Sequence, residues 1–180
     1  MFSVVIATND SERALVATLA ALVPGATAGV VREVIVADGG SRDETEQVAD
    51  IAGCRFFSSV EPLGARLSAA TAMARGEWLM FLAPGIAPQP GWIDDTIAFV
   101  RQDQPGAAVF SPAPGGILTR MRRALGRLPR PEQGLILRKA FYAELGGHRT
   151  DAAEPEADLL RRIGRARLTV LRASIARSDI

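Results

Sequence analysis

The amino-acid sequence predicts a single α/β domain in which helices flank a mostly parallel central sheet. Short apolar runs of strand length alternate with segments whose apolar residues recur at helical spacing. This alternation is typical of parallel strands joined by right-handed helical crossovers. The chain has 180 residues, of which 48% are hydrophobic, and this is enough for one sizeable core. We therefore expect one domain over residues 1–180, with a first half at 1–106 and a second half at 107–180.

The N-terminal unit is a strand followed by a helix. Residues 3–8 (SVVIAT) are apolar and rich in β-branched side chains, which favours a buried strand. Residues 9–11 are typical of a turn and a helix cap. Leucines at helical spacing predict a helix over 12–23, and Pro24 and Gly25 indicate that a loop begins there.

The segment at 32–43 (REVIVADGGSRD) is the most informative stretch of the chain. Residues 34–37 predict a strand buried on both faces, and this strand ends abruptly at Asp38. Ser41 is placed to cap the next helix, with Glu44 as its capping-box partner. The carboxylate of Asp38 then stands at the carboxyl end of a central strand, where open α/β sheets bind their ligands.

The same reasoning predicts the remaining elements. Apolar runs bounded by glycine, proline or polar residues indicate strands at 54–58, 77–82, 107–111, 133–137 and 167–171. Helical spacing and terminating glycines indicate helices at 45–51, 63–74, 93–100, 117–128, 139–145 and 156–163. The proline- and glycine-rich segment 83–92 is expected to be an irregular loop.

Composition narrows the functional classes. Cys54 is the only cysteine, which excludes an internal disulfide and a cysteine-built metal site. We find no signal-peptide pattern and no apolar run of membrane-spanning length, so a cytoplasmic location is expected. Residues 1–116 contain 7 basic and 13 acidic side chains, whereas residues 117–180 contain 14 and 7. The basic C-terminal part would suit phosphates or an anionic membrane surface, although a solvated face is the simpler interpretation.

Taken in order, these segments resemble the family 2 glycosyltransferases, which use the nucleotide-sugar-binding GT-A fold. The matching segments are 3–22, 34–45, 64–82, 133–147 (QGLILRKAFYAELGG) and 158–163 (DLLRRI). The resemblance implies a nucleotide-sugar-binding half at 1–106 and an acceptor-side half at 107–180. It implies a nucleotide-sugar donor, in the first place a UDP-sugar, and an acceptor that the sequence does not identify. It gives no reason to expect nucleic-acid binding.

The resemblance also implies roles for individual residues. Thr8 and Asn9 would line the nucleobase and ribose pocket, and Asp38 would accept hydrogen bonds from the uracil or the ribose. Arg66, near the start of the helix at 63–74, would contact the base or a phosphate.

An acidic cluster precedes the last predicted helix. Where the family usually has Glu-Asp-x-Asp-Leu, this chain has PEADL at 155–159, so Glu156 stands at the position of the general base. A carboxylate there would remove the acceptor proton, and Glu154 is the substitute if the register shifts by two. The alternative interpretation is that these acids only cap and solvate the helix N-terminus.

The expected metal motif is missing. The family places carboxylates directly after the strand at 77–82 to hold Mn²⁺ or Mg²⁺ against the diphosphate, but here Ala83, Pro84 and Gly85 occupy that place. We therefore expect no metal ligands in this loop and consider a metal-independent transferase in which arginines neutralise the diphosphate. The arginines that suit this role are Arg120, Arg122, Arg123, Arg127 and Arg130.

Two alternatives remain open. The chain could be a degenerate, non-catalytic nucleotide-binding or protein-interaction module with the same fold. The basic helix at 117–128 could also bring an enzyme to a membrane surface, against the simpler interpretation of a solvated packing helix. His148 follows Gly146 and Gly147, where the family often has an aromatic residue, and we expect it to be a surface-loop histidine.

Overall fold

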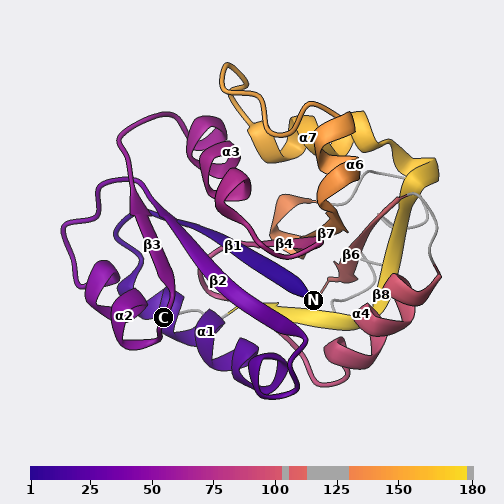
Figure 1. Ribbon diagram of the computed structural model, residues 1–180, viewed down its shortest axis with the longest axis horizontal. Helices are drawn as coiled ribbons and strands as arrows, with labels where there is room; N and C mark the ends of the chain where they lie inside the picture. The colour runs from indigo at the N-terminus through magenta and orange to yellow at the C-terminus, as the bar shows by residue number, and fades with distance from the viewer. Residues whose placement is uncertain (103–105, 113–129, 178–180) are drawn as a thin grey trace.

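The computed structural model describes residues 1–102, 106–112 and 130–177, and its strands form one sheet in the order β3-β2-β1-β4-β7-β6-β8-β5 (Figure 1). The strands are β1 (Phe2–Thr8), β2 (Val31–Asp38), β3 (Arg55–Ser58), β4 (Trp78–Leu82), β5 (Ile86–Pro88), β6 (Ala107–Ser111), β7 (Leu135–Arg138) and β8 (Leu168–Arg177). The helices are α1 (Glu12–Thr27), α2 (Thr45–Ile51), α3 (Leu63–Met73), α4 (Trp92–Arg101), α6 (Lys139–Glu144) and α7 (Pro155–Ile163). Two 3₁₀ turns, η1 (Pro131–Gln133) and η2 (Arg165–Arg167), precede β7 and β8.

The sheet is mostly parallel, as the sequence predicts. Strand β1 pairs in parallel with β2 and β4, β2 with β3, and β6 with β8. Strand β7 runs antiparallel between β4 and β6, so one sheet joins the two halves of the chain. The carboxyl ends of the parallel strands therefore meet at a common edge, and the loops that follow them lie together.

Helices cover both faces of the sheet, and each face has its own core. Helices α1, α2 and α4 pack on one face, and α3, α6 and α7 pack on the other, in the upper part of Figure 1. In β2, Val36 packs with the first group of helices and Ile35 with the second. Both side chains are fully buried, which confirms the prediction of a strand covered on two sides.

Helix α1 is longer than predicted. It continues through Pro24 and Gly25 to Thr27 instead of ending before Pro24. A Cβ on Gly25 would lie 2.4 Å from Trp92 Cη2, so a side chain at this position would clash with α4. The Val30 amide donates to the Gly25 carbonyl at 2.9 Å, which joins the end of the helix to the start of β2. Tertiary packing of the last turn thus outweighs the local effect of proline.

The prediction of an irregular loop at 83–92 is wrong in its centre. Residues 86–88 form β5, which pairs antiparallel with the end of β8, and β8 extends to Arg177 instead of ending near 171. The Gly85 amide also donates to the Ala14 carbonyl of α1 at 2.9 Å. These partners are distant in sequence, so no local pattern could reveal the pairing.

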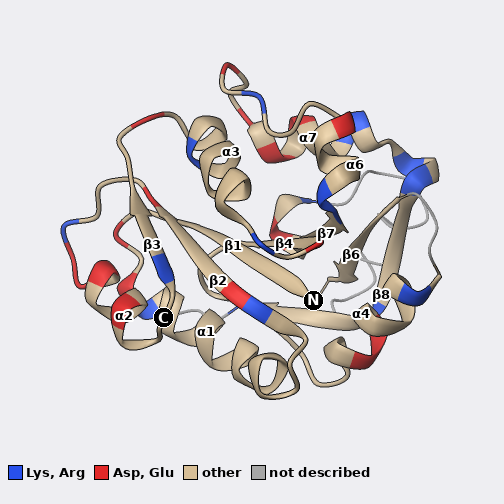
Figure 2. Ribbon diagram, viewed as in Figure 1, with Lys and Arg blue, Asp and Glu red and all other residues tan. Residues whose placement is uncertain are grey.

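Lys and Arg residues, blue in Figure 2, occur at several places along α6, α7 and β8. The predicted helix at 117–128, with its proposed membrane contact, lies outside the described residues and stays a prediction. No helix in the described ranges combines the length and the apolar character needed to cross a membrane.

Candidate functional site

The loops after β1 and β2 are joined through the carboxylate of Asp38. Thr8 and Asp38 are register partners at the ends of their strands, and Asp38 is only 1% exposed. Asp38 Oδ1 accepts hydrogen bonds from the hydroxyls of Thr8 (2.8 Å) and Ser41 (2.5 Å). Oδ2 accepts from the amides of Gly40 and Ser41, each at 2.8 Å, and from the Ser58 hydroxyl at 3.1 Å. Five donors, from the ends of β1 and β3 and from the turn after β2, therefore converge on one carboxylate.

These donors keep Asp38 ionised. Burial alone would raise the pKa of this carboxyl, but the hydrogen bonds from Ser41, Thr8 and Gly40 outweigh burial and lower the pKa below its ordinary value. A buried anion whose lone pairs are filled by the chain acts first as the organiser of the turn at 38–41. Direct acceptance of a hydrogen bond from a base or ribose would displace one of these internal donors.

The helix caps differ from those predicted. Ser41 does not cap α2, because its hydroxyl donates to Asp38 instead. Glu44 occupies the N-cap position, and its side chain caps no backbone amide. Asp43 provides the polar contacts instead. Its Oδ1 accepts from the Thr45 amide at 3.1 Å and its Oδ2 from the Glu12 amide at 3.0 Å, so it serves the starts of both α2 and α1. The spacing of Asp43 from Thr45 was the available signal for this role.

Arg66 lies directly beneath this turn. Its side chain is buried, Nη1 donates to the carbonyls of Thr8 (3.1 Å) and Ala37 (2.8 Å), and Nε donates to the Glu61 carbonyl at 3.2 Å. Among the residues that the structure describes, no carboxylate forms an ion pair with Arg66. A Cβ on Gly39 would lie 3.0 Å from Arg66 Cζ, so the glycine allows the guanidinium to approach the backbone. The edge of the sheet thus holds a positive charge without a paired side-chain anion.

The four predicted nucleotide-binding residues come together at this edge. Asn9 is exposed. A Cβ on Gly39 would lie 3.0 Å from Asn9 Nδ2 and also 3.0 Å from the Arg66 guanidinium, so both side chains lie against Gly39. Thr8 supplies a carbonyl to Arg66 and a hydroxyl to Asp38. The geometry therefore groups Thr8, Asn9, Asp38 and Arg66 around one turn at the carboxyl ends of β1 and β2.

Glu156 lies in the first turn of α7, in the second half of the chain. Burial raises the pKa of its carboxyl, and the negative charge of Glu132 in η1 raises it further. Glu154 is exposed and occupies the N-cap position without a side-chain cap. Asp158 instead forms ion pairs with Arg162 at 2.8 Å and Arg161 at 3.9 Å, which lower its pKa against the raising effect of its desolvation. The pKa of Glu156 is raised whereas that of Asp158 is lowered, and a raised pKa strengthens a carboxylate as a proton acceptor.

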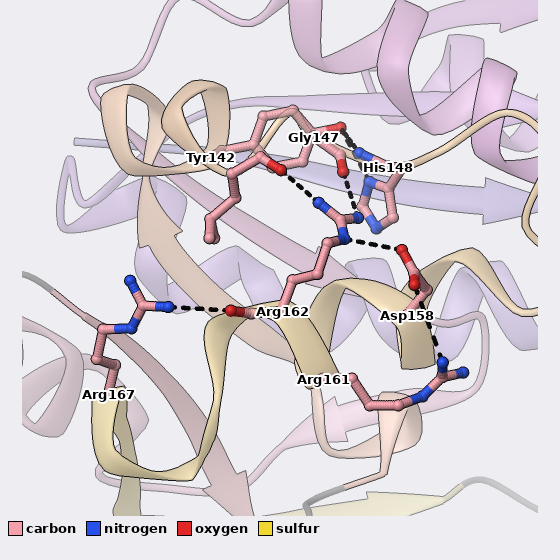
Figure 3. Close-up of polar contacts among 8 residues, drawn as sticks. Tyr142, Gly147, His148, Asp158, Arg161, Arg162 and Arg167 are labelled. Atoms are coloured by element: carbon pink, nitrogen blue, oxygen red, sulfur yellow. Dashed lines mark hydrogen bonds and ion pairs between the residues drawn. The ribbon is translucent and has the colours of Figure 1, made fainter.

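His148 is buried, so the prediction of a surface-loop histidine is wrong. Its ring is only 3% exposed and packs edge-on against Phe81, with 4.8 Å between ring centroids. Nδ1 lies 3.0 Å from the Tyr142 hydroxyl, which also accepts the His148 amide at 2.9 Å (Figure 3). Burial and the nearby Arg162 guanidinium lower the pKa of His148 to about 3. An aromatic neighbourhood, which the local sequence does not display, decides this placement.

The loop after β4 offers no side chain to a hard cation. Ala83, Pro84 and Gly85 lead into β5, and no group of three or more His, Cys, Asp or Glu able to hold a metal occurs in the described ranges. Mn²⁺ and Mg²⁺ prefer carboxylate and water oxygens, so Ala83, Pro84 and Gly85 do not fit a divalent cation of this kind.

The family model of glycosyl transferase family 2 matches residues 3–153. The chain belongs to glycosyltransferase family 2. The match includes β1, β2, α3 and β7, and therefore the four residues grouped around the Asp38 turn, but it ends just before α7. No curated protein sequence matches the chain.

Solved structures of GT-A glycosyltransferases share the fold. The glucosyl-3-phosphoglycerate synthase GpgS of Mycobacterium tuberculosis aligns with a TM-score of 0.75 and 20% identity, over 100% of this chain and 72% of that protein. It was crystallised with Mn²⁺, UDP and glucosyl-3-phosphoglycerate. S. aureus TarS 1–349 aligns with a TM-score of 0.75 and 19% identity, over 97% of this chain and 59% of that chain. The GT-A architecture is therefore common to all three proteins, and this chain spans about three fifths of the TarS fragment.

Proposed function

We propose that this chain binds a nucleoside diphosphate sugar at the carboxyl ends of β1 and β2 and transfers the sugar to an acceptor hydroxyl. The observation that supports this proposal most strongly is the grouping of Thr8, Asn9 and Arg66 around the turn held by Asp38. The M. tuberculosis GpgS was also crystallised with UDP-glucose, which makes a UDP-sugar the first donor to test.

In this proposal Asp38 acts by positioning. Its carboxylate is filled by five donors of the chain, so it shapes the turn at 38–41 and fixes Thr8 at the end of β1. The exposed Asn9 amide lies beside the turn and meets the nucleoside. Arg66, which has no ion-pair partner in the described ranges, supplies positive charge to an anionic ligand.

Glu156 is the proposed general base. An inverting transfer needs a carboxylate that removes the proton of the acceptor hydroxyl as the bond to the sugar forms. Burial and Glu132 raise the pKa of Glu156, which strengthens it as a proton acceptor. The leaving diphosphate gains negative charge in the same step and must be stabilised electrostatically.

We propose that this stabilisation does not come from a divalent cation. Ala83, Pro84 and Gly85 have no side-chain oxygen, and arginine can neutralise phosphate oxygens through two parallel hydrogen bonds. Arg130, beside η1, is the described member of the arginine set that the sequence indicates; the other members, at 120, 122, 123 and 127, lie outside the described residues.

A non-catalytic nucleotide-binding module is the second candidate function. The residues at 83–85 favour it, because they lack the side chains that hold a metal against the diphosphate. It predicts nucleotide binding without sugar transfer.

The test is an assay of UDP release from a panel of UDP-sugars, with and without pooled acceptors, in parallel with calorimetric binding of UDP and ADP. The transferase proposal predicts tight binding of UDP over ADP and a release of UDP that Glu156→Gln abolishes. Binding without release favours the non-catalytic module. If UDP does not bind, both candidates fail.

A further inference from the structure

The Arg162 side chain connects helix α7 to the end of helix α6 (Figure 3). Its Nε donates to Asp158 Oδ2 at 2.8 Å, within α7. Nη1 donates to the Leu145 carbonyl at 2.5 Å and Nη2 to the Gly147 carbonyl at 2.6 Å. The side chain is only 17% exposed, so these bonds are shielded from water. One guanidinium thus ties α7 to the segment that follows α6.

The two carbonyls are natural targets for a cation. Leu145 is the C-cap residue directly after α6, and the last carbonyls of a helix have no partner within the helix. A positive charge at this end is also favoured by the helix dipole. The planar guanidinium reaches both carbonyls and Asp158 at once, which a lysine ammonium on a single stem cannot do.

The segment that receives Arg162 is itself fixed. Gly147 has φ of +62°, and a Cβ there would lie 2.8 Å from Tyr142 Cε1, so the backbone lies tightly on the tyrosine ring. The Gly147 amide donates to the Tyr142 carbonyl, and the His148 amide to the Tyr142 hydroxyl, each at 2.9 Å. Arg162 therefore anchors α7 to a rigid part of the core.

The Glu156 side chain has no polar anchor of its own among the described residues. In the described ranges no hydrogen bond or ion pair holds the Glu156 side chain, so its place is set by the backbone of the first turn of α7. In that turn the Asp158 amide donates to the Glu154 carbonyl at 2.9 Å. Asp158 is in turn held by Arg162, four residues later on the same helix.

We propose that Arg162 is a positioning residue for the proposed base: by tying Asp158 to the end of α6, it fixes the helix turn from which Glu156 meets the acceptor. The proposal rests on the proposed function, in which Glu156 removes the acceptor proton. Arg162 touches neither donor nor acceptor in this scheme and acts only through the turn.

Neighbouring arginines allow a matched test. Arg162→Lys keeps the positive charge but loses the planar guanidinium with its several N–H donors, and Arg162→Gln loses both the charge and the guanidinium. Arg161→Gln is the control, because the Arg161 side chain is 59% exposed and meets Asp158 only at 3.9 Å. Each variant is compared with wild type by thermal melting, UDP affinity, UDP release from a UDP-sugar, and a ¹³C NMR titration of the Glu156 carboxyl, assigned with Glu156→Gln.

The proposal predicts that Arg162→Lys folds, keeps wild-type UDP affinity and loses about 10- to 100-fold in the rate of UDP release, the scale of a misplaced catalytic group. The pKa of Glu156 falls toward its ordinary value, because a loosened turn admits water to the carboxylate. Arg161→Gln changes none of these quantities.

A folded Arg162→Lys with unchanged Glu156 titration and unchanged UDP release would overturn the proposal. Unfolding of both Arg162 variants would also overturn it, because Arg162 would then contribute to stability alone. The NMR titration needs no substrate. If wild type fails to bind UDP while Glu156 still responds to Arg162, the proposed function fails and the positioning of Glu156 stands.

Discussion

Thr8 and Asp38 face each other at the ends of two neighbouring parallel strands, and the Thr8 hydroxyl donates to Asp38 Oδ1 at 2.8 Å. This bond is one of five that fill the Asp38 carboxylate with donors of the chain itself. The proposed nucleotide site is therefore built on a turn whose shape is fixed before a ligand arrives, which reduces the entropy lost on binding.

Replacing Asp38 by alanine should destabilise the protein by about 1–3 kcal/mol, because the buried Thr8 hydroxyl and the partly buried donors of the turn lose their acceptor. The measurement is the free energy of unfolding in urea, together with UDP affinity by calorimetry. Ser58→Ala is the control, since it removes only the longest of the five bonds, at 3.1 Å. If Asp38→Ala is as stable as Ser58→Ala and binds UDP equally well, Asp38 does not organise the site.

Arg66→Lys tests whether the buried guanidinium supports an anionic ligand. Lysine keeps the charge but cannot serve the carbonyls of Thr8, Ala37 and Glu61 together, so we expect UDP affinity to fall about tenfold, or roughly 1.4 kcal/mol. Arg75 is exposed and lies two residues after the end of α3, so Arg75→Lys should leave UDP affinity unchanged. Equal affinities for both variants would rule out this role for Arg66.

Glu156→Gln should stabilise the fold at neutral pH while abolishing UDP release. Because the pKa of Glu156 is raised in the folded state, ionisation of its carboxyl opposes folding. The protein therefore keeps its full stability below the ordinary pKa of glutamate and loses stability as the pH rises through the folded pKa. Glutamine removes this loss, for an expected gain of about 1 kcal/mol, or roughly 2–4 °C in Tm, at pH 7. The gain should shrink as the pH is lowered. A variant that is destabilised at pH 7 would contradict the raised pKa.

His148→Phe should reduce the loss of the free energy of unfolding as the pH falls below about 6.5. The folded pKa of His148 is about 3, whereas an unfolded histidine has a pKa of about 6.5. The unfolded state therefore binds more protons between these values, and stability falls as the pH drops below about 6.5, by up to roughly 1.4 kcal/mol per pH unit from this one group. Urea unfolding between pH 4 and 7 measures this slope. Parallel profiles for the two proteins would show that His148 titrates normally in the fold.

Local patterns predicted much of the fold, because strands such as β2 and helices such as α3 bury residues at spacings that the sequence displays. They failed where distant contacts decide the structure. Trp92 holds the end of α1 around Gly25, and β5 exists only because β8 returns to pair with it. The same limit applies to the candidate site. Family resemblance indicated Asp38, Arg66 and Glu156, but the filling of Asp38 by hydroxyls and amides, the burial of His148 and the approach of Glu132 to Glu156 all depend on tertiary packing.

Calorimetric titration of wild-type protein with UDP, once in EDTA and once with excess Mn²⁺, tests the proposed donor site most directly. We predict saturable binding in EDTA with an affinity that Mn²⁺ does not increase, because Ala83, Pro84 and Gly85 offer the cation no side-chain ligand. Binding that requires Mn²⁺, or is strengthened tenfold by it, would contradict a metal-independent site. The absence of UDP binding under both conditions would contradict the donor site itself.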